Sequence, residues 1–307
     1  MMYINKWYSI AGKKEYEGLV KNANKYIKDY YYGEKTFEEA EEKMLKEVIS
    51  NLVNCNNDYL IIGGNLSNQL SVLNKVLEKY EYSYLGLYSA CATFVEGLII
   101  ACKFNQESIV LTSSHNLTAE RQFRFPIEYG GLKKKYGNDT ITAAVGCIVS
   151  NKKSKYKLGN YTIGEVVDSE IKDATNMGAV MAPSAASTIY KHLLKYNKTL
   201  DDYDLILTGD LGRLGLTLLN EILKSQYGII KNSIVDAGSL VYPENDKYLG
   251  ASGPSVLPYV LFNKIFDSKI KKLLIVGTGA LHSPTLVNHQ NTIPAIAHAI
   301  EIEVTYD

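Results

Sequence analysis

One pattern of strands and helices occurs twice along this chain of 307 residues, and the repeat limits the possible folds more than any other feature. Residues Asp58–Leu66 (DYLIIGGNL) resemble Tyr203–Leu211 (YDLILTGDL). Each segment reads as a buried strand followed by a glycine turn that carries Asn65 or Asp210. A single match of this length arises easily by chance, so the later matches decide whether the repeat is real.

Three later elements match in the same order. The matching pairs are Tyr84–Gly86 with Tyr248–Gly250, the helix after Cys91 with the helix after Ser255, and Ile109–Ser113 with Leu274–Thr278. We therefore expect two similar halves, residues 1–150 and 151–307, that together form one compact unit. The halves are expected to pack face to face, with corresponding turns meeting near a pseudo-twofold axis.

Short apolar, β-branched runs alternate with helical patterns, which predicts an α/β fold with largely parallel or mixed buried sheets. The expected strands are Asp58–Gly63, Tyr84–Leu87, Ser108–Thr112, Thr142–Ser150, Tyr161–Val167, Asp204–Thr208, Ser233–Val235 and Lys272–Val276. The expected helices are Gly33–Asn54, Asn68–Tyr80, Thr93–Phe104, Ala185–Tyr196, Leu216–Gln226 and Val256–Ser268. The Lys-rich stretch Asn151–Asn160 reads as the weakest joint between the halves.

Charge and cysteine content exclude several classes of function. The chain has 33 basic and 33 acidic residues, so it lacks the basic surplus of a nucleic-acid-binding protein. Its cysteines form no C-x-x-C pair, which argues against a zinc site, and we expect free thiols, no metal and no cofactor. We also expect no signal peptide and no membrane span, because the start lacks an apolar core and no apolar run is long enough.

The segment Ser89–Thr93 (SACAT) is the strongest candidate for a site. Cys91 follows a strand and precedes a helix, whose N-terminus favours a thiolate and offers backbone donors. The small neighbours would let a ligand approach the backbone closely. The alternative is that Cys91 is a small buried residue of the core.

A duplicated βαβαβ half with a cysteine elbow before a helix resembles the thiolase fold of condensing enzymes. More specific motifs resemble the stage V sporulation protein AD family over nearly the whole chain. These motifs are Thr112–Asn116 (TSSHN), Thr118–Pro126 (TAERQFRFP), Glu128–Gly131 (EYGG), Met181–Pro183 (MAP), Asp201–Leu211, Thr278–Leu281 (TGAL), Ser283–Thr285 (SPT) and Thr292–His298 (TIPAIAH).

The resemblance implies a thiolase-like fold in five layers, α-β-α-β-α, and a function in binding. Members of this family bind dipicolinic acid or its calcium chelate while the spore core is loaded, together with membrane proteins of the same sporulation system. A homodimer and a place in the forespore or spore, soluble or at the inner spore membrane, are expected on the same ground. Two alternatives stay open: a condensing or acyl-transfer enzyme that uses Cys91, and a structural partner that binds no ligand.

The residues themselves argue against condensation. A condensing cysteine needs two partner groups, usually His with His or His with Asn. One partner normally follows the first strand of the second half, where this chain has Thr208–Asp210 (TGD), and the other lies at the elbow Ala251–Ser255 (ASGPS). Neither segment contains His or Asn, and an acid near the thiol would oppose thiolate formation.

A flat ring with two carboxylates calls for paired donors and an apolar slot. Arg121 is a candidate because guanidinium binds carboxylate with two hydrogen bonds, and His115 lies nearby in the sequence. The helix start at Cys91–Thr93 adds backbone donors, so Thr93 is included, and His282 could close the slot behind the loop Gly277–Gly279. Arg121 and His115 have a structural alternative, in a salt-bridged loop or in hydrogen bonds of the fold.

Two acidic residues complete the set of candidates. Asp210 could contact calcium if the chelate is the ligand, because calcium prefers oxygen ligands. As an alternative, Asp210 could cap a helix at its turn. Asp168 ends an expected strand of the second half and could face the centre of the molecule.

Overall fold

The fold is described from a computed structural model. The described residues are 1–54, 57–123, 137–230, 234–244 and 249–306. The main sheet contains β1 (Met2–Ala11), β2 (Lys25–Tyr26), β3 (Leu60–Asn65), β4 (Ser83–Gly86), β5 (Ser108–Ser114), β7 (Ala143–Ser150), β8 (Tyr156–Thr162), β9 (Leu205–Thr208), β10 (Ile234–Asp236), β12 (Lys272–Ala280) and β13 (Ala295–Val304). A second, two-stranded sheet pairs β6 (Asp139–Thr140) with β11 (Ala251–Ser252).

Strand order shows the duplication directly. In the first half the order across the sheet is β4-β3-β5-β7-β1, and in the second half it is β10-β9-β12-β13-β8. Counted along the chain, both orders read third, second, fourth, fifth, first. The pairing also agrees, because the third, second and fourth strands run parallel while the fifth is antiparallel to both of its neighbours. The halves join where β1 pairs antiparallel with β8.

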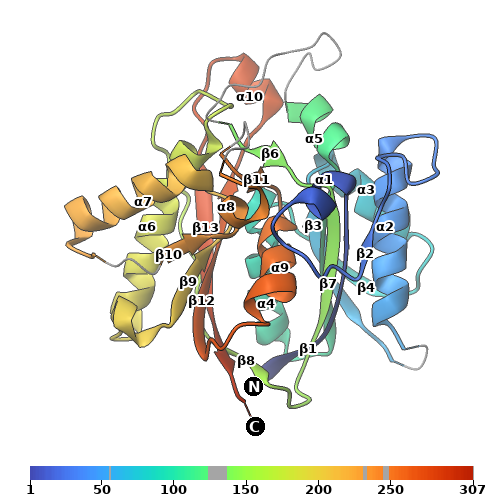
Figure 1. The fold of residues 1–307 in the computed structure, drawn as a ribbon, viewed down its shortest axis with the longest axis horizontal. Coiled ribbons are helices and arrows are strands. Elements are labelled where there is room, and N and C mark those ends of the chain that lie inside the picture. The colour runs from blue at the N-terminus through green and yellow to red at the C-terminus, as the bar shows by residue number, and fades with distance from the viewer. Residues whose placement is uncertain (55–56, 124–136, 231–233, 245–248, 307) are drawn as a thin grey trace.

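Helices cover both outer faces and fill the space between the halves (Figure 1). On one outer side lie α2 (Phe37–Leu52) and α3 (Ser71–Leu77), and on the other lie α6 (Met177–Lys195) and α7 (Gly212–Tyr227). The central layer contains α4 (Thr93–Phe104) and α9 (Val256–Val260), which continues as a π-helical turn over Leu261–Ile265. This arrangement gives the expected five layers, α-β-α-β-α. The short helices are α1 (Lys13–Glu17), α5 (Asn116–Phe123), α8 (Ala237–Val241) and α10 (Pro284–Asn288).

Local sequence explains where the principal outer helix begins. Thr36 and Glu39 form a capping box at the start of α2, in which the Thr36 hydroxyl accepts from the Glu39 backbone and the Glu39 carboxylate accepts from the Thr36 backbone. The apolar face of α2 then packs on β1 and β7. Such a cap stabilises a helix by about 1 kcal/mol.

Several expectations about the elements are wrong. The loop expected at Gly277–Gly279 is part of β12. The strand expected at Tyr161–Val167 runs instead over Tyr156–Thr162, so half of the supposed joint Asn151–Asn160 lies in β8 between β1 and β13. Its polar residues are tolerated because they alternate with buried Tyr156 and Leu158. The strand equivalent to β4 is β10, and not Tyr248–Gly250; Tyr248 lies outside the described residues, and Gly250 precedes β11.

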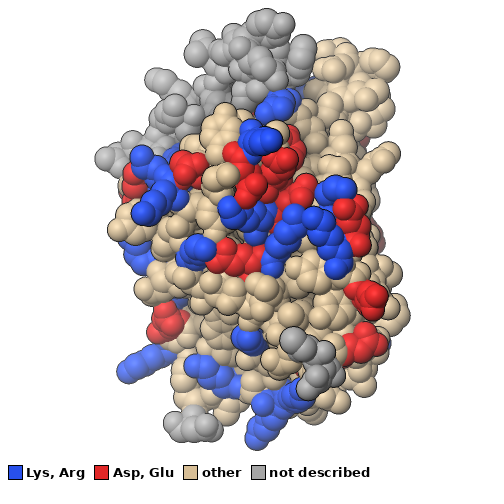
Figure 2. All heavy atoms as spheres, turned by 90° about the vertical axis from the view of Figure 1, so that its right-hand side faces the viewer, with Lys and Arg blue, Asp and Glu red and all other residues tan. Residues whose placement is uncertain are grey.

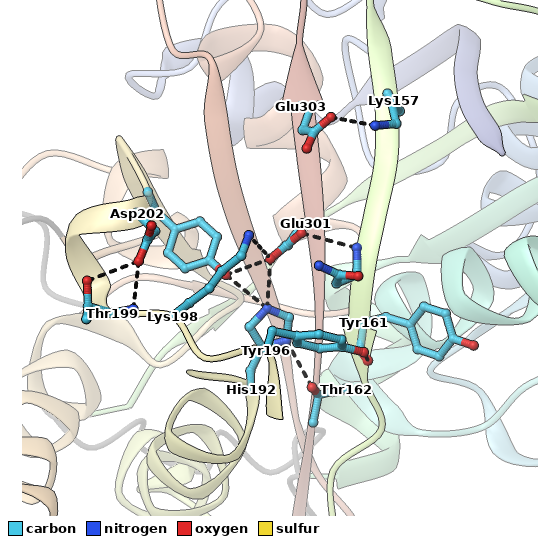
Figure 3. A network of polar contacts seen from close by, with 12 residues as sticks. Lys157, Tyr161, Thr162, His192, Tyr196, Lys198, Thr199, Asp202, Glu301 and Glu303 are labelled. Carbon is cyan, nitrogen blue, oxygen red and sulfur yellow. Dashed lines mark hydrogen bonds and ion pairs between the residues drawn. The ribbon is translucent and has the colours of Figure 1, made fainter. Parts of the chain in front are cut away.

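The second half contains a buried network of polar contacts around Glu301 of β13 (Figure 3). Its carboxylate accepts from Lys198 Nζ at 2.7 Å, Tyr203 Oη at 2.7 Å and His192 Nε2 at 3.3 Å. His192 Nδ1 lies 2.9 Å from the Thr162 hydroxyl. These donors hold the pKa of Glu301 at about 2 although its side chain is buried, and the network ties α6 to β8 and β13.

The helices within the described residues include none that combines the length and the apolar character needed to span a membrane.

Candidate functional site

A pocket of about 330 Å³ opens where the two halves meet. One wall is apolar and includes Leu66, Tyr88, Phe123, Met177 and Met181. Polar side chains interrupt this wall from both halves: Cys91, Glu120, Asn138, Thr140, Thr175, Ser252, His282 and Ser283. An apolar cavity with a few convergent polar groups is the usual form of a small-molecule site.

The elbow that presents Cys91 is held by local hydrogen bonds. Ala90 has φ 49°, in the left-handed region that non-glycine residues rarely adopt. The hydroxyl of Thr93 donates to the Ala90 carbonyl at 2.7 Å and accepts from the Ser89 backbone N–H at 3.3 Å. Thr93 is buried and fixes the turn, and it does not itself line the pocket.

Cys91 faces a hydroxyl and a carboxylate from the second half. Its Sγ lies 3.9 Å from the Ser252 Oγ, and that hydroxyl donates to Asp210 Oδ2 at 2.8 Å. Burial of the thiol and the negative charge of Asp210 raise the pKa of Cys91 well above its usual range. The thiol is therefore neutral near pH 7, as the sequence-based argument about an acid at this position expected.

Hydrogen bonds occupy both carboxylate oxygens of Asp210. Besides Ser252, the Gly253 backbone N–H donates to Oδ2 at 3.0 Å, and the Thr278 hydroxyl donates to Oδ1 at 3.0 Å. Asp210 is fully buried and lies behind the pocket lining, and burial raises its pKa. It connects the turn after β9 to the second-half elbow and to β12, so it positions Ser252 beside the thiol.

A second buried acid, Asp236, supports the same turn. One of its oxygens accepts from Thr208 Oγ1 at 2.9 Å and from the Leu211 backbone N–H at 2.8 Å, and the other accepts from the Gly212 backbone N–H at 2.9 Å. Burial raises the pKa of Asp236 to about 6, with a further contribution from the charge of Asp210. The sequence analysis did not single out Asp236, because its partners come from a turn distant along the chain.

His282 follows β12 and lines the same pocket as the first-half elbow. Its ring meets Phe123 edge-on, with centroids 5.2 Å apart. Both ring nitrogens are buried and have no hydrogen-bond partner among the described residues. Burial lowers the pKa of His282, which makes the neutral imidazole the form present near pH 7.

The wall around Tyr88 is braced by Gln122 of α5. The Gln122 amide donates to the Leu66 carbonyl at 3.0 Å and to Asn68 Oδ1 at 2.9 Å, and its carbonyl accepts from the Asn68 backbone N–H at 2.9 Å. The Tyr88 hydroxyl donates to the same Leu66 carbonyl at 3.2 Å. This set of bonds holds the apolar wall in place from the first half.

Three of the residues that the sequence suggested for the site lie elsewhere. His115 is buried between β5 and α2, where its Nε2 lies 2.8 Å from the Tyr30 carbonyl and its ring stacks on Phe37. Asp168 is exposed and accepts from Thr292 Oγ1 at 2.6 Å. Neither residue lines the pocket.

Arg121 also lies outside the pocket lining. Its guanidinium is half exposed, sits over the Phe37 ring, and has Nη1 3.9 Å from Glu38 Oε1 at the start of α2. Figure 2 shows the face formed by α2 and its neighbours, on which Lys and Arg side chains are interspersed with Asp and Glu. The motif residues Arg124 and Glu128 lie outside the described residues.

The described ranges contain no group of three or more His, Cys, Asp or Glu side chains that could hold a metal ion. Ser252, Asn138 and the two methionines of α6 were missed as lining residues. Met181 belongs to one of the family motifs, but composition and spacing alone carry no sign that α6 turns this side chain toward the elbow of the other half.

With this geometry established, comparison with known proteins decides the family. The sequence profile of stage V sporulation protein AD matches residues 1–303. The chain belongs to this family. Stage V sporulation protein AD of Bacillus subtilis (strain 168) is 34% identical over 318 residues, which cover 98% of this chain and 94% of the relative.

Solved structures of condensing enzymes share the fold of this family member. The tetronic acid condensing enzyme AbyA1 aligns with a TM-score of 0.59 and 12% identity over 99% of this chain and 100% of its own. The 3-oxoacyl-[acyl-carrier-protein] synthase III of Aquifex aeolicus VF5 aligns with a TM-score of 0.56 and 14% identity, over 98% of this chain and 97% of its own. A variant of Xanthomonas campestris OleA with one glutamate replaced by glutamine aligns with a TM-score of 0.60 and 12% identity, over 98% of each chain. At this level of identity the likeness shows the thiolase-like fold alone.

Proposed function

We propose that this stage V sporulation protein AD family member binds dipicolinic acid, or its calcium chelate, in the pocket beside Cys91. The bound ligand would be handed on during its uptake into the developing spore, without condensing-enzyme catalysis. The family resemblance implies the ligand. The observation that carries the choice of binding over catalysis is that Cys91 Sγ faces the Ser252 hydroxyl, which donates to the buried carboxylate of Asp210.

The surroundings of Cys91 suit binding rather than catalysis because they disfavour ionisation of the thiol to the thiolate. A nucleophilic cysteine needs a base or a positive charge within reach. Here the nearest partner of Sγ is the Ser252 hydroxyl, which itself donates to a buried carboxylate. The raised pKa of the thiol leaves it as a small, weakly polar lining group.

The pocket also fits the shape and chemistry of a small aromatic acid. Its volume of about 330 Å³ falls near the lower end of the range for ligand sites, roughly 300–1,000 Å³. Phe123, Tyr88 and the α6 methionines offer flat and adaptable apolar surface for a ring. His282 and Asn138 offer N–H groups for carboxylates, although one N–H of the Asn138 amide already donates to the Asp210 carbonyl at 2.8 Å.

Asp210 has no part as a calcium ligand in this proposal, because both of its oxygens already accept hydrogen bonds. If the chelate binds, the two carboxylates of the ligand supply part of the coordination of calcium, and other oxygen atoms such as those of water complete it. We further propose that the protein works as a homodimer in the forespore or spore, in contact with the membrane proteins of its sporulation system.

Calorimetric titration of the purified protein with dipicolinic acid, with and without calcium, tests the proposal. We expect saturable binding that Cys91→Ala weakens several-fold, and that Arg121→Ala leaves unchanged because Arg121 lies outside the pocket lining. No binding of either form would favour the role of a structural partner without a ligand.

Intact-mass measurement after incubation with acyl-CoA tests the enzymatic alternative, which the shared fold of the condensing enzymes keeps open. We expect no adduct on wild-type protein. Stoichiometric acylation of Cys91 followed by turnover would overturn the non-catalytic proposal.

A further inference from the structure

We propose that binding of an anionic ligand in the Cys91 pocket is coupled to the uptake of one proton by His282. This inference rests on the proposed function, since it concerns the same pocket. It goes further by assigning the group that supplies positive charge and by making the affinity depend on pH.

The position of His282 is the first argument. The residue lies two positions after Ala280, the last residue of β12, and its backbone N–H donates to the Ala280 carbonyl at 2.8 Å, which sets the direction of the loop. The ring lies at the pocket with Phe123 edge-on against it. Phe123 covers the ring without offering a hydrogen bond, so it leaves the nitrogens to a ligand.

The two unpartnered nitrogens are the second argument. A buried polar group without a partner costs about 1–3 kcal/mol, and native structures retain few of them. In His282 both Nδ1 and Nε2 are buried and lack a partner among the described residues. The other histidines that bury their rings use at least one nitrogen within the fold, as His115 does with the Tyr30 carbonyl. A ligand carboxylate would supply the missing acceptor.

The charge of the pocket is the third argument. The titratable groups that line it are Cys91 from the first-half elbow, Tyr88 before that elbow, Glu120 from α5 and His282, with Asp210 behind Ser252. Lys and Arg are absent from the described lining residues. Within that set, His282 is the residue that can become positive near pH 7, and a carboxylate beside it favours the charged imidazolium.

The sign of the coupling follows. Burial lowers the pKa of His282 in the empty pocket, so the imidazole is neutral there. A bound carboxylate raises this pKa, and between the free and the bound pKa each binding event takes up a proton. Affinity should therefore increase by up to about tenfold for each unit by which the pH falls across this interval, and level off below the free pKa.

Calorimetry with calcium-free dipicolinate at pH 7, in two buffers of different ionisation enthalpy, measures the protons taken up. We expect close to one proton for each ligand bound to wild-type protein. His282→Gln keeps hydrogen-bonding groups and cannot become charged, so its uptake should fall to zero and its affinity should lose the pH dependence. His289→Gln, which changes an exposed histidine seven residues along the chain, is the matched control and should behave as wild type.

Binding without proton uptake, or unchanged uptake in His282→Gln, would overturn the inference while the proposed function stands. If the protein binds the calcium chelate but not calcium-free dipicolinate, the inference is likewise overturned and the proposed function stands. Failure of both ligand forms to bind would remove the proposed function as well. Should His282→Gln fail to fold, an NMR titration of the His282 ring in wild-type protein, with and without dipicolinate, decides the question: an unchanged pKa overturns the inference.

Discussion

The two elbows of the duplicated fold occupy equivalent places and meet at the pocket, but they are held in different ways. The first-half elbow, Ser89–Thr93, is fixed by its own Thr93, whose hydroxyl bridges the Ala90 carbonyl and the Ser89 N–H. The second-half elbow, Ser252–Ser255, is fixed by distant residues. The Asp210 carboxylate accepts from the Ser252 hydroxyl and the Gly253 backbone N–H of this elbow. The Ser255 hydroxyl donates to Thr112 Oγ1 of β5 at 3.2 Å.

Each elbow is also covered by the fourth strand of the other half. A side chain at Gly279 of β12 would collide with the Ser89 carbonyl, and a side chain at Gly253, whose φ is 127°, would collide with Ser114 at the end of β5. The self-supported elbow is the one that presents Cys91 to the pocket, while the other supplies the Ser252 and Asp210 that keep the thiol neutral. Duplication thus produced one presenting elbow and one positioning elbow.

The largest expected effect comes from removing the support of the second elbow. Asp210→Ala leaves the Ser252 and Thr278 hydroxyls and the Gly253 N–H without their acceptor, at about 1 kcal/mol or more for each group. We expect the free energy of unfolding to fall by about 3 kcal/mol in urea titrations. The matched control is the exposed acid Asp58, and Asp58→Ala should change stability by less than about 0.5 kcal/mol. A loss below about 1 kcal/mol in Asp210→Ala would show that the elbow does not depend on this carboxylate.

A second comparison between the halves concerns two buried acids, Glu301 in β13 of the second half and Glu41 in α2 of the first half. Glu301 in the second half has Lys198, Tyr203 and His192 as donors, and its pKa is lowered to about 2 (Figure 3). Glu41 in the first half is buried beside Ser113, which donates to it at 2.6 Å, and burial raises its pKa to about 7. Opposite shifts predict opposite pH dependence.

The contribution of Glu301 to stability is present above its unfolded pKa, near 4.5, and is lost as the pH falls toward 2. Glu301→Gln should therefore lower the free energy of unfolding by about 2 kcal/mol at pH 7, with a difference that shrinks by about half at pH 3. Glu41→Gln is the matched control, for which we expect the reverse dependence of stability on pH. Because the charged form of Glu41 destabilises the folded state, the free energy of unfolding of the variant should increase relative to that of wild type as the pH rises from 5 to 8. Parallel slopes for both variants would contradict the assignment.

The smallest effect concerns the reactivity of Cys91. Asp210→Asn removes the negative charge near the thiol and keeps much of the hydrogen-bonding capacity, so the pKa of Cys91 should fall. A fall of one unit gives about a tenfold faster alkylation by iodoacetamide near neutral pH. Peptide mass spectrometry measures each cysteine separately. Cys102, whose pKa is raised to about 11 by burial, should keep its rate in the same digest, and an unchanged rate at Cys91 would exclude the electrostatic explanation.

Local patterns were sufficient for three of the four matched elements of the repeat, for the helix at Thr93–Phe104, and for the meeting of Cys91 with Asp210, while the match of Tyr84–Gly86 with Tyr248–Gly250 failed. These features depend on short-range periodicity and on a symmetry that the sequence carries twice. The same patterns failed at β8, because its residues are polar on one side and are held in place by pairing with β1 and β13, which lie far away in the chain.

The candidate site residues also fall into two groups, those that local sequence patterns identified and those that only contacts between distant residues revealed. The sequence by itself determined that the chain has no net charge and adopts an α/β fold. It also determined that the elbow with Cys91 lies near the acid Asp210. Only the tertiary structure decided that Arg121 and His115 face α2, while His282 and the α6 methionines line the pocket. The physical reason is that side-chain direction depends on the exact ends of strands and on the helix packed against them, and both are set by contacts between residues distant in the sequence.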